Sequence, residues 1–375
     1  MAESYPFDPR ATSSGNVLRV LCDGREIFTA IHRAISSAAK QIALEIYMFE
    51  GDATGRRVLR DLVEAARRGC KVRVIYDGIG SLWTRDSFFD PLLKAGGEVF
   101  VYHPPLPWVP GWGVKHRDHR KMLLVDDHWV LIGGMNIAAE YERLPGEGGF
   151  HDLAVEVQGP ASAQAWNLFE RTWKRRSRAS VEPKPRPIPI PEPGAPFAEI
   201  VGNGRFRDRW RIRRRILYAI RQAEESIDIV NPYFLPDPGL IRALRDAVRR
   251  GVRVRVIVPR ASDVPIVDLA SMVAQRKLIR REVAVYIWPG IVHAKAVSID
   301  RTWLCIGTYN FDHLSLFNNL EVVVNALDHG AGEQLGSILE RDVTLGTRLT
   351  EEYFLRLPWW TRIGARLFYR LRTFL

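Results

Sequence analysis

The sequence carries one pattern of polar residues twice, and this internal repeat is the strongest constraint on how the chain can fold. In each copy a histidine is followed by a lysine, an aspartate and an asparagine at matching positions. The repeated residues are His119, Lys121, Asp126 and Asn136 in the first copy and His293, Lys295, Asp300 and Asn310 in the second. The copies keep one offset, because 293 − 119 and 310 − 136 both equal 174. Such a recurrence predicts two copies of one structural unit.

The repeat extends upstream, where each copy predicts a helix followed by a strand. Residues 57–68 carry apolar side chains at helical spacing and stop at a glycine, and residues 72–76 are short and β-branched. The counterparts are a helix over 240–250, again followed by a glycine, and a strand over 252–258. Helices that alternate with short apolar strands predict an α/β fold, with a mixed β-sheet flanked by helices in each of two pseudo-symmetric domains.

A proline-rich segment separates the two copies. Residues 181–196 contain seven prolines in sixteen positions. Proline has no backbone N–H to donate, so this segment suits an extended connector better than a helix or a central strand. We therefore expect a first domain over 1–180, a linker over 181–196, a second domain over 197–350 and a C-terminal tail over 351–375.

Composition narrows the class of partner. Hydrophobic residues make up 46% of the chain and charged residues 26%, which is typical of a folded protein. The net charge of +11 favours a polyanionic partner, either nucleic acid or an acidic membrane surface. Three widely spaced cysteines, Cys22, Cys70 and Cys305, predict a reducing compartment rather than a disulfide framework. We see no signal-peptide pattern and no apolar run that predicts a transmembrane helix, so any membrane contact is expected to be peripheral.

The duplicated histidine and lysine suit chemistry on a phosphodiester. Residues two apart on a strand point to the same face, so His119 and Lys121 should project together, as should His293 and Lys295. One such strand from each domain would place two imidazoles and two ammonium groups around one pocket. The lysines and the two asparagines can bind the non-bridging oxygens. One histidine can attack phosphorus to form a phosphohistidine, and the other can protonate the leaving alcohol and deprotonate the incoming one.

The duplicated motif resembles the signature of the phospholipase D superfamily. The similarity to bacterial cardiolipin synthases covers most of the chain and includes residues 45–49, 133–138, 140–141, 152–160, 231–234 and 314–321. It implies two phospholipase D-like domains with the active site at their interface. It also implies a cardiolipin synthase of the type without N-terminal transmembrane helices.

The resemblance further implies roles for individual residues. His119 is implied as the nucleophile and His293 as the general acid and base, although the near symmetry of the copies leaves the reverse assignment open. The first copy has Gly134 where the second has Thr308. The expected site residues are His119, Lys121, Asp126, His293, Lys295 and Asp300 for catalysis, Asn136, Asn310 and Thr308 for substrate binding, and Asp152 and Glu321 as orienting partners of the imidazoles.

Metal catalysis is an alternative, because the run from His116 to His119 is rich in possible ligands. The cation of Lys121 would oppose a divalent ion, and no second cluster of ligands completes a coordination sphere. We therefore expect neither a metal nor another cofactor.

Two segments favour a lipid substrate independently of the resemblance. Wound as a helix, Trp359–Leu375 places aromatic and aliphatic residues on one half and arginines on the other, as in interfacial helices, although a helix that caps a core would look similar. A proline- and tryptophan-rich insertion between Tyr102 and His119 would suit an acyl-chain entry lip or an ordinary surface loop. The seven arginines in Arg205–Arg215 could bind lipid headgroups, bind nucleic acid or form a solvated helix face. They do not discriminate between these interpretations.

We therefore expect phosphatidyl transfer between phospholipids, giving cardiolipin from phosphatidylglycerol and the hydroxyl of a second lipid. The alternatives are a hydrolase that releases phosphatidic acid, and a phosphodiesterase or nuclease that acts on nucleic acid. The expected partners are anionic phospholipids, with phosphatidylglycerol first and phosphatidylethanolamine as a second candidate. The expected location is cytoplasmic, with peripheral association at the inner face of the cell membrane.

Overall fold

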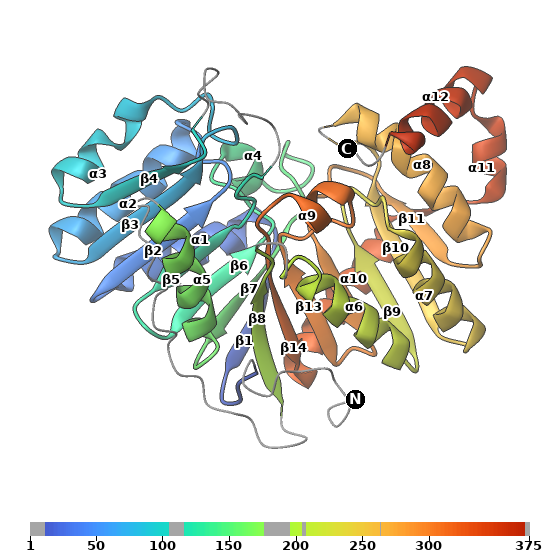
Figure 1. Cartoon of the computed structure of the whole chain (residues 1–375), viewed down its shortest axis with the longest axis horizontal. Coiled ribbons are helices and arrows are strands. Elements are labelled where there is room, and N and C mark those ends of the chain that lie inside the picture. The colour runs from blue at the N-terminus through green and yellow to red at the C-terminus, as the bar shows by residue number, and fades with distance from the viewer. Residues whose placement is uncertain (1–11, 105–115, 176–195, 205–207, 263, 372–375) are drawn as a thin grey trace.

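Two mixed β-sheets lie side by side in the molecule, with helices on their outer sides (Figure 1). The structure, a computed structural model, describes residues 12–104, 116–175, 196–204, 208–262 and 264–371. Nearly all of the predicted linker and most of the predicted insertion before His119 lie outside the described residues.

The first sheet has seven strands. They are β1 (Val17–Cys22), β2 (Gln41–Ile46), β3 (Lys71–Asp77), β4 (Glu98–Tyr102), β5 (Met122–Val125), β6 (Trp129–Gly133) and β7 (Leu153–Gln158). Their order across the sheet is β1-β7-β6-β5-β2-β3-β4. Strands β2, β3 and β4 are parallel, and the other neighbours are antiparallel.

The second sheet repeats this arrangement with one extra edge strand. Its members are β8 (Phe197–Gly202), β9 (Ser226–Val230), β10 (Arg253–Pro259), β11 (Ala284–Trp288), β12 (Ala296–Ile299), β13 (Trp303–Gly307), β14 (Val322–Leu327) and β15 (Thr347–Arg348). Read from β8, the order is β8-β14-β13-β12-β9-β10-β11-β15, which is the order of the first sheet shifted by seven strands. The predicted α/β fold with two pseudo-symmetric sheets is confirmed.

Helices follow the same repeat. The first half contains α1 (Asp23–Ser37), α2 (Ala53–Arg67), the 3-10 helix η2 (Asp86–Phe89), α3 (Asp90–Lys94), α4 (Ala139–Glu142) and α5 (Ser162–Lys174). The second half contains α6 (Arg211–Gln222), α7 (Pro238–Arg249), α8 (Pro265–Ile279), α9 (His313–Phe317) and α10 (His329–Leu345).

The predicted helix–strand pairs correspond to α2 with β3 and α7 with β10. Asp52 and Asp237 cap the two helices by accepting a backbone N–H of the first turn at 2.8 and 2.7 Å. Gly69 and Gly251 follow the helix ends with φ of +94° and +92°, a conformation that favours glycine. The same local signals therefore begin and end the same helix in both halves.

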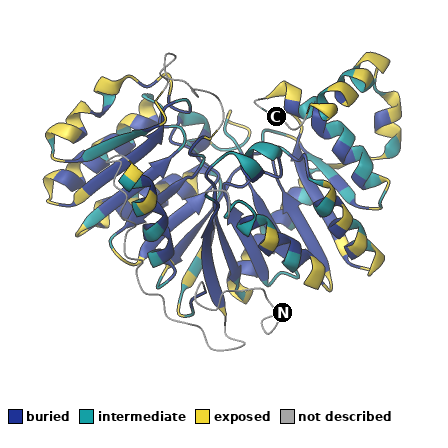
Figure 2. Cartoon of the chain, viewed as in Figure 1, coloured by how far each residue is buried: buried dark blue, intermediate teal, exposed yellow. Residues whose placement is uncertain are grey.

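Among the described residues, three large hydrophobic cores hold the sheets and helices together. Helices α1 and α2 pack on one face of the first sheet, and α6 and α7 pack on one face of the second. The third core joins the halves, because Val155 and Leu304 from the two sheets pack with Trp166 of α5 and Leu335 of α10. Figure 2 shows the sheets as almost continuously buried, while the helices expose their outer sides.

The chain ends in α11 (Glu351–Arg356) and α12 (Trp359–Arg370), at the upper right of Figure 1. Helix α12 lies along α8, where Phe368 and Tyr369 pack near Val267 and Ala270. Of the helices in the described part of the chain, none has the length and apolar character needed to span a bilayer.

Candidate active site

The two repeated histidines lie where the halves of the chain meet. His119 precedes β5 and His293 precedes β12. The backbone N–H of His119 donates to the carbonyl of Leu320 at 3.0 Å, and that of His293 donates to the carbonyl of His151 at 2.8 Å. Each histidine segment is thus paired, by backbone hydrogen bonds, with a segment from the other half.

The two orienting carboxylates are exchanged between the halves. Both oxygens of Glu321 lie 3.0 Å from His119 Nδ1, and Asp152 Oδ2 lies 2.9 Å from His293 Nδ1. An acceptor at Nδ1 keeps the proton on that nitrogen, so Nε2 is left to face a substrate. The sequence predicted both carboxylates but did not indicate that each would serve the opposite histidine.

Two buried lysines complete the centre. Lys121 Nζ donates to the carbonyl of His119 at 2.9 Å, and Lys295 Nζ donates to the carbonyl of His293. Burial, together with the ammonium of Lys295, lowers the pKa of Lys121 to about 7. Two buried ammonium groups that act on one another in this way favour the binding of an anion.

Burial and the nearby lysines also lower the pKa values of the two imidazoles. Burial and the ammonium of Lys295 lower the pKa of His293 to about 4, against the opposing effect of Asp152. Burial also lowers the pKa of His119, and Lys121 and Lys295 add to that effect. Because each lysine acts on the histidine of the other half, the four groups form one electrostatic site.

The predicted substrate-binding residues have different surroundings. Asn136 Oδ1 accepts the N–H of Met48 at 3.2 Å. Asn310 Oδ1 is buried without a hydrogen-bond partner among the described residues, and a half-turn of the amide would present its N–H groups there instead. Thr308 is fully buried and donates its hydroxyl to Glu321, so it acts on the carboxylate that holds His119.

Gly134 stands at the position that corresponds to Thr308. A Cβ there would lie 2.3 Å from Asp152 Oδ1 and 2.9 Å from the carbonyl oxygen of His293. The first half therefore needs a residue without a side chain where the second half uses a hydroxyl. This difference explains why the repeat is imperfect at this point.

The aspartates of the motif lie away from the catalytic centre, which corrects their placement in the catalytic set. Asp126 accepts the backbone N–H groups of residues 39–41 at 2.8 to 3.1 Å, and Asp300 accepts those of residues 224–226 at 2.8 to 3.0 Å. Each lies beyond the far end of β5 or β12, roughly 16 Å along the strand from the lysine at about 3.3 Å per residue. Both aspartates fasten the turn that leads into β2 or β9.

Several residues at the centre were not assigned a role from the sequence. The rings of Tyr47 and Tyr141 meet the imidazoles of His119 and His293 edge-on, at centroid distances of 5.2 and 5.0 Å. Arg120 crosses between the halves and donates to the carbonyls of Asn203 and Glu321 at 2.8 and 3.2 Å. The sequence around these residues carries no signal of such contacts, because the contacts depend on how the halves pack.

His151 links the two halves next to Asp152. Its Nδ1 lies 2.6 Å from Asp23 and its Nε2 lies 2.9 Å from Asp342 of α10. These carboxylates overcome the effect of burial and raise the pKa of His151 well above its ordinary value. With Cys22 and Asp23, His151 also forms a grouping of possible metal ligands, but both ring nitrogens are engaged by carboxylates.

Comparison with known proteins agrees with this architecture. The family described as "Cardiolipin synthase, PLD-like domain" matches residues 31–173 and 216–343, which is more than half of the chain. The major cardiolipin synthase ClsA of Bacillus subtilis (strain 168) is 32% identical over 353 residues, covering 93% of this chain and 73% of that protein. Cardiolipin synthase B of Escherichia coli (strain K12) is 31% identical over 375 residues, covering 96% and 89%.

A solved structure shares the whole fold. The crystal structure of phosphatidylserine synthase from Haemophilus influenzae Rd KW20 aligns with a TM-score of 0.72 at 14% identity, over 96% of this chain and 95% of that one. The duplicated α/β architecture and the paired histidine motifs define a protein of the phospholipase D superfamily. Within it, the chain belongs to the cardiolipin synthase family with phospholipase D-like domains.

Proposed function

We propose that the chain makes cardiolipin by transferring a phosphatidyl group from phosphatidylglycerol to a hydroxyl of a second phospholipid, through a phosphohistidine intermediate. Membership of the family makes it a phosphatidyltransferase that acts on phospholipids. The observation that carries the finer proposal is the pair of imidazoles, each held at Nδ1 by a carboxylate of the opposite half and flanked by two buried lysines.

In the first step, Nε2 of His119 attacks phosphorus of the donor lipid. The bond between phosphorus and the headgroup oxygen breaks, and His293 gives its proton to that oxygen, so glycerol leaves. In the second step, the hydroxyl of the acceptor lipid gives its proton to His293 and attacks phosphorus. The phosphorus–nitrogen bond breaks, which releases cardiolipin and free His119.

The charges around the site support this division of work. Lys121 and Lys295 can bind the non-bridging oxygens, whose negative charge changes as the transition state forms. The lysines lower the pKa of His293 in the free protein. A bound phosphodiester would offset their charge and raise that pKa, so that His293 could hold the proton it must donate.

We further propose that α12 holds the protein on anionic membranes. Trp360, Ile363 and Leu367 lie along one side of the helix and are 62, 55 and 54% exposed, because the packing against α8 uses the other side. Arg362, Arg366 and Arg370 lie on the same helix and can meet lipid phosphates. The exposed upper part of α12 is visible in Figure 2.

A second apolar contact would come from the first half. Leu82 and Trp83 are 50 and 83% exposed and follow the carboxyl end of β3. Strand β5 runs antiparallel to β2, so His119 lies at this same edge of the sheet. Contacts from both halves at this edge would turn the catalytic centre toward the bilayer and support peripheral association with the inner face of the cell membrane.

The test is incubation of the purified protein with phosphatidylglycerol vesicles, read by mass spectrometry. Cardiolipin and glycerol should appear, and protein denatured in detergent at neutral pH, where a phosphorus–nitrogen bond survives, should carry a phosphatidyl group that is lost in His119→Ala. In His293→Ala the adduct should form more slowly, because the acid of the first step is missing, but it should persist once formed while turnover stops. Phosphatidic acid as the sole product would show a hydrolase, and cleavage of plasmid DNA without lipid turnover would show a nuclease. Either result would reject the proposal.

A further inference from the structure

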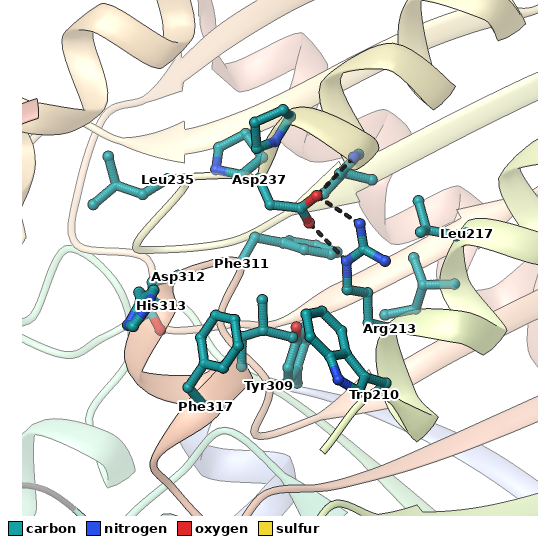
Figure 3. Close-up of a pocket in the computed structure, with 15 residues that line it drawn as sticks. Trp210, Arg213, Leu217, Leu235, Asp237, Tyr309, Phe311, Asp312, His313 and Phe317 are labelled. Atoms are coloured by element: carbon teal, nitrogen blue, oxygen red, sulfur yellow. Dashed lines mark hydrogen bonds and ion pairs between the residues drawn. The ribbon is translucent and has the colours of Figure 1, made fainter. Parts of the chain in front are cut away.

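A largely apolar pocket, partly open to solvent, lies in the second half of the chain (Figure 3). Its volume is about 270 Å³, whereas an apolar cavity of about 150 Å³ is enough to bind benzene. Its walls come from α6, the segment that leads into α7, and α9. The apolar lining includes Ile216, Leu217, Leu235, Leu240, Phe311 and Leu316.

The charged groups on the wall are already compensated. Arg213 donates from Nε and Nη2 to Asp237 at 2.8 and 2.6 Å, as the dashed lines in Figure 3 show. Asp312 accepts the backbone N–H of Ser315 at 2.7 Å. With Arg213 and Asp237 paired and Asp312 bound to a backbone N–H, most of the remaining lining is apolar. An apolar ligand would gain by removing the aliphatic and aromatic surface from water.

Helix α9 connects the cavity to the catalytic centre. On one side, Ser315 donates its hydroxyl to Glu321 at 2.7 Å, and Glu321 holds His119. On the other side, Leu316 and Phe317 line the cavity. Tyr309, also on the wall, is the neighbour of Asn310 in sequence. A ligand with its phosphate at the histidines could therefore reach the cavity with an attached chain.

The matching place in the first half is filled. Helix α4 is the counterpart of α9, since 313 − 139 is 174, and α1 is the counterpart of α6. A Cβ on Gly24 of α1 would lie 2.2 Å from the carbonyl oxygen of Tyr141 in α4, so these elements are in direct contact. Residues 39–41 and 224–226, bound by Asp126 and Asp300, give an offset of 185 for these helices, so the buried Phe28 corresponds to Arg213, which turns toward Asp237. The cavity is therefore a feature of one half and not of the repeat.

We infer that this cavity binds the end of one acyl chain of a phospholipid whose phosphate lies at the histidine pair. The inference rests on the proposed function, because it takes a lipid as the substrate. Each methylene that leaves water for such a site strengthens binding roughly three- to fourfold. The cavity would make the protein distinguish between substrates by chain length, at the same headgroup.

The experiment compares dihexanoyl- and dioctanoyl-phosphatidylglycerol, both below the concentrations at which they form micelles. For the wild type we expect kcat/KM to be roughly tenfold higher with the longer chains, the effect of two methylenes on one chain. Leu217→Trp on α6 and Leu240→Phe on α7 fill the cavity from different walls. Each should bring the ratio close to one while kcat/KM for the dihexanoyl lipid stays within about twofold. Tyr218→Trp, the next residue of α6, is the matched control and should keep the wild-type ratio.

Thermal unfolding of each variant checks that it is folded. If both filled variants unfold at the wild-type temperature and still keep the tenfold ratio, the acyl-chain site is overturned. Calorimetric binding of the two lipids to His119→Ala separates this inference from the proposed reaction. A chain-length preference in binding that is lost in the filled variants would support the cavity site even if the wild type transferred no phosphatidyl group. Equal binding of both lipids to His119→Ala and its filled variants would overturn it.

Discussion

Glu321 and His119 lie 202 residues apart in the chain, yet both carboxylate oxygens are 3.0 Å from the imidazole Nδ1. The reciprocal contact joins Asp152 to His293 at 2.9 Å. Each histidine is held by a carboxylate of the other half, so the proposed catalytic centre requires the halves to be packed together. The shared core and the link through His151 hold that packing in place.

Removing the charge of Glu321 should strongly reduce activity. Glu321→Gln keeps the shape of the side chain but offers His119 Nδ1 an amide that can present N–H instead of oxygen, so the proton can move to Nε2. We expect kcat to fall by at least about 10²-fold, in the range of lost acid–base or nucleophilic assistance. Glu333→Gln, on the exposed side of α10, is the control and should keep wild-type kcat. Wild-type kcat in Glu321→Gln would show that the carboxylate does not orient the histidine.

Gly134 tests how closely the other carboxylate is held. A methyl group at this position would meet Asp152 Oδ1 at 2.3 Å and must displace it. Misplacement of a catalytic group by about 1 Å can cost up to about 100-fold, so we expect Gly134→Ala to lower kcat between about tenfold and 100-fold. Gly364→Ala, whose added Cβ meets nothing within 4 Å, should leave kcat unchanged. Equal kcat in the two variants would contradict the steric argument.

The sequence predicted the architecture because its signals are local and occur twice. The apolar residues at helical spacing and the glycines after α2 and α7 mark the same helix in both halves. The paired histidine and lysine of each copy likewise follow from residue types at short spacing. These features depend on a few neighbouring residues, which is the information that a sequence pattern carries.

The remaining features depend on packing between distant segments. The exchange of Asp152 and Glu321 between the halves cannot be inferred from spacing, because each carboxylate could equally serve its own histidine. Asp126 and Asp300 belong to the motif but bind backbone N–H groups at the far end of the strand. In α12, Phe368 was predicted on the same apolar face as Leu367, but packing on α8 leaves Leu367 exposed while Phe368 is half-buried.

Anion binding should weaken above neutral pH. The pKa of Lys121 is lowered to about 7, so its ammonium is present below that pH and is lost as the pH rises through it. We expect the affinity for dihexanoyl-phosphatidylglycerol to fall as the pH increases from 6 to 9. The double variant His119→Ala/His293→Ala should have no turnover and has neither imidazole of the pair, so calorimetry on it measures the affinity without their titration. Adding Lys121→Met should make the affinity lower and independent of pH, and a pH-independent affinity in the double variant would argue against this assignment.

The same lysine should cost stability. An ordinary lysine has a pKa near 10.4, so between about pH 7 and 10 the unfolded chain binds a proton at residue 121 that the folded protein does not. Stability contributed by this group therefore rises with pH across that window and is lowest below it. We expect Lys121→Met to raise the free energy of unfolding at pH 7 by up to about 4 kcal/mol, because one unit of pKa lowering corresponds to about 1.4 kcal/mol. The gain should shrink toward pH 10.

Urea unfolding at the two pH values measures this difference. Lys71→Met is the control, because Lys71 is exposed at the start of β3 and should show no gain that depends on pH. A loss of stability in Lys121→Met at pH 7 would mean that the attraction between the ammonium and the nearby carboxylates of Glu321 and Asp152 outweighs the cost of burying the ammonium.

The exposed side of α12 should decide membrane binding. We expect Trp360→Gln/Ile363→Gln/Leu367→Gln to lower the partitioning onto phosphatidylglycerol vesicles by at least about 100-fold, since each apolar side chain withdrawn from lipid removes up to about 1.5–3 kcal/mol. The helix itself should remain folded, because Ala365, Phe368 and Tyr369 still pack toward α8. Sedimentation with vesicles measures the partitioning, and circular dichroism checks the helix content.

A matched control separates this helix from apolar exposure in general. Leu93 and Leu345 are 49 and 55% exposed but lie on other helices or their ends, and Leu93→Gln/Leu345→Gln should keep wild-type vesicle binding. Turnover of soluble dihexanoyl-phosphatidylglycerol should be unchanged in both multiple variants, because none of these residues contacts the histidine pair. Raising the salt concentration should weaken the binding that remains, because salt screens the attraction between the arginines of α12 and the lipid phosphates. Wild-type vesicle binding by the α12 variant would show that another surface meets the membrane.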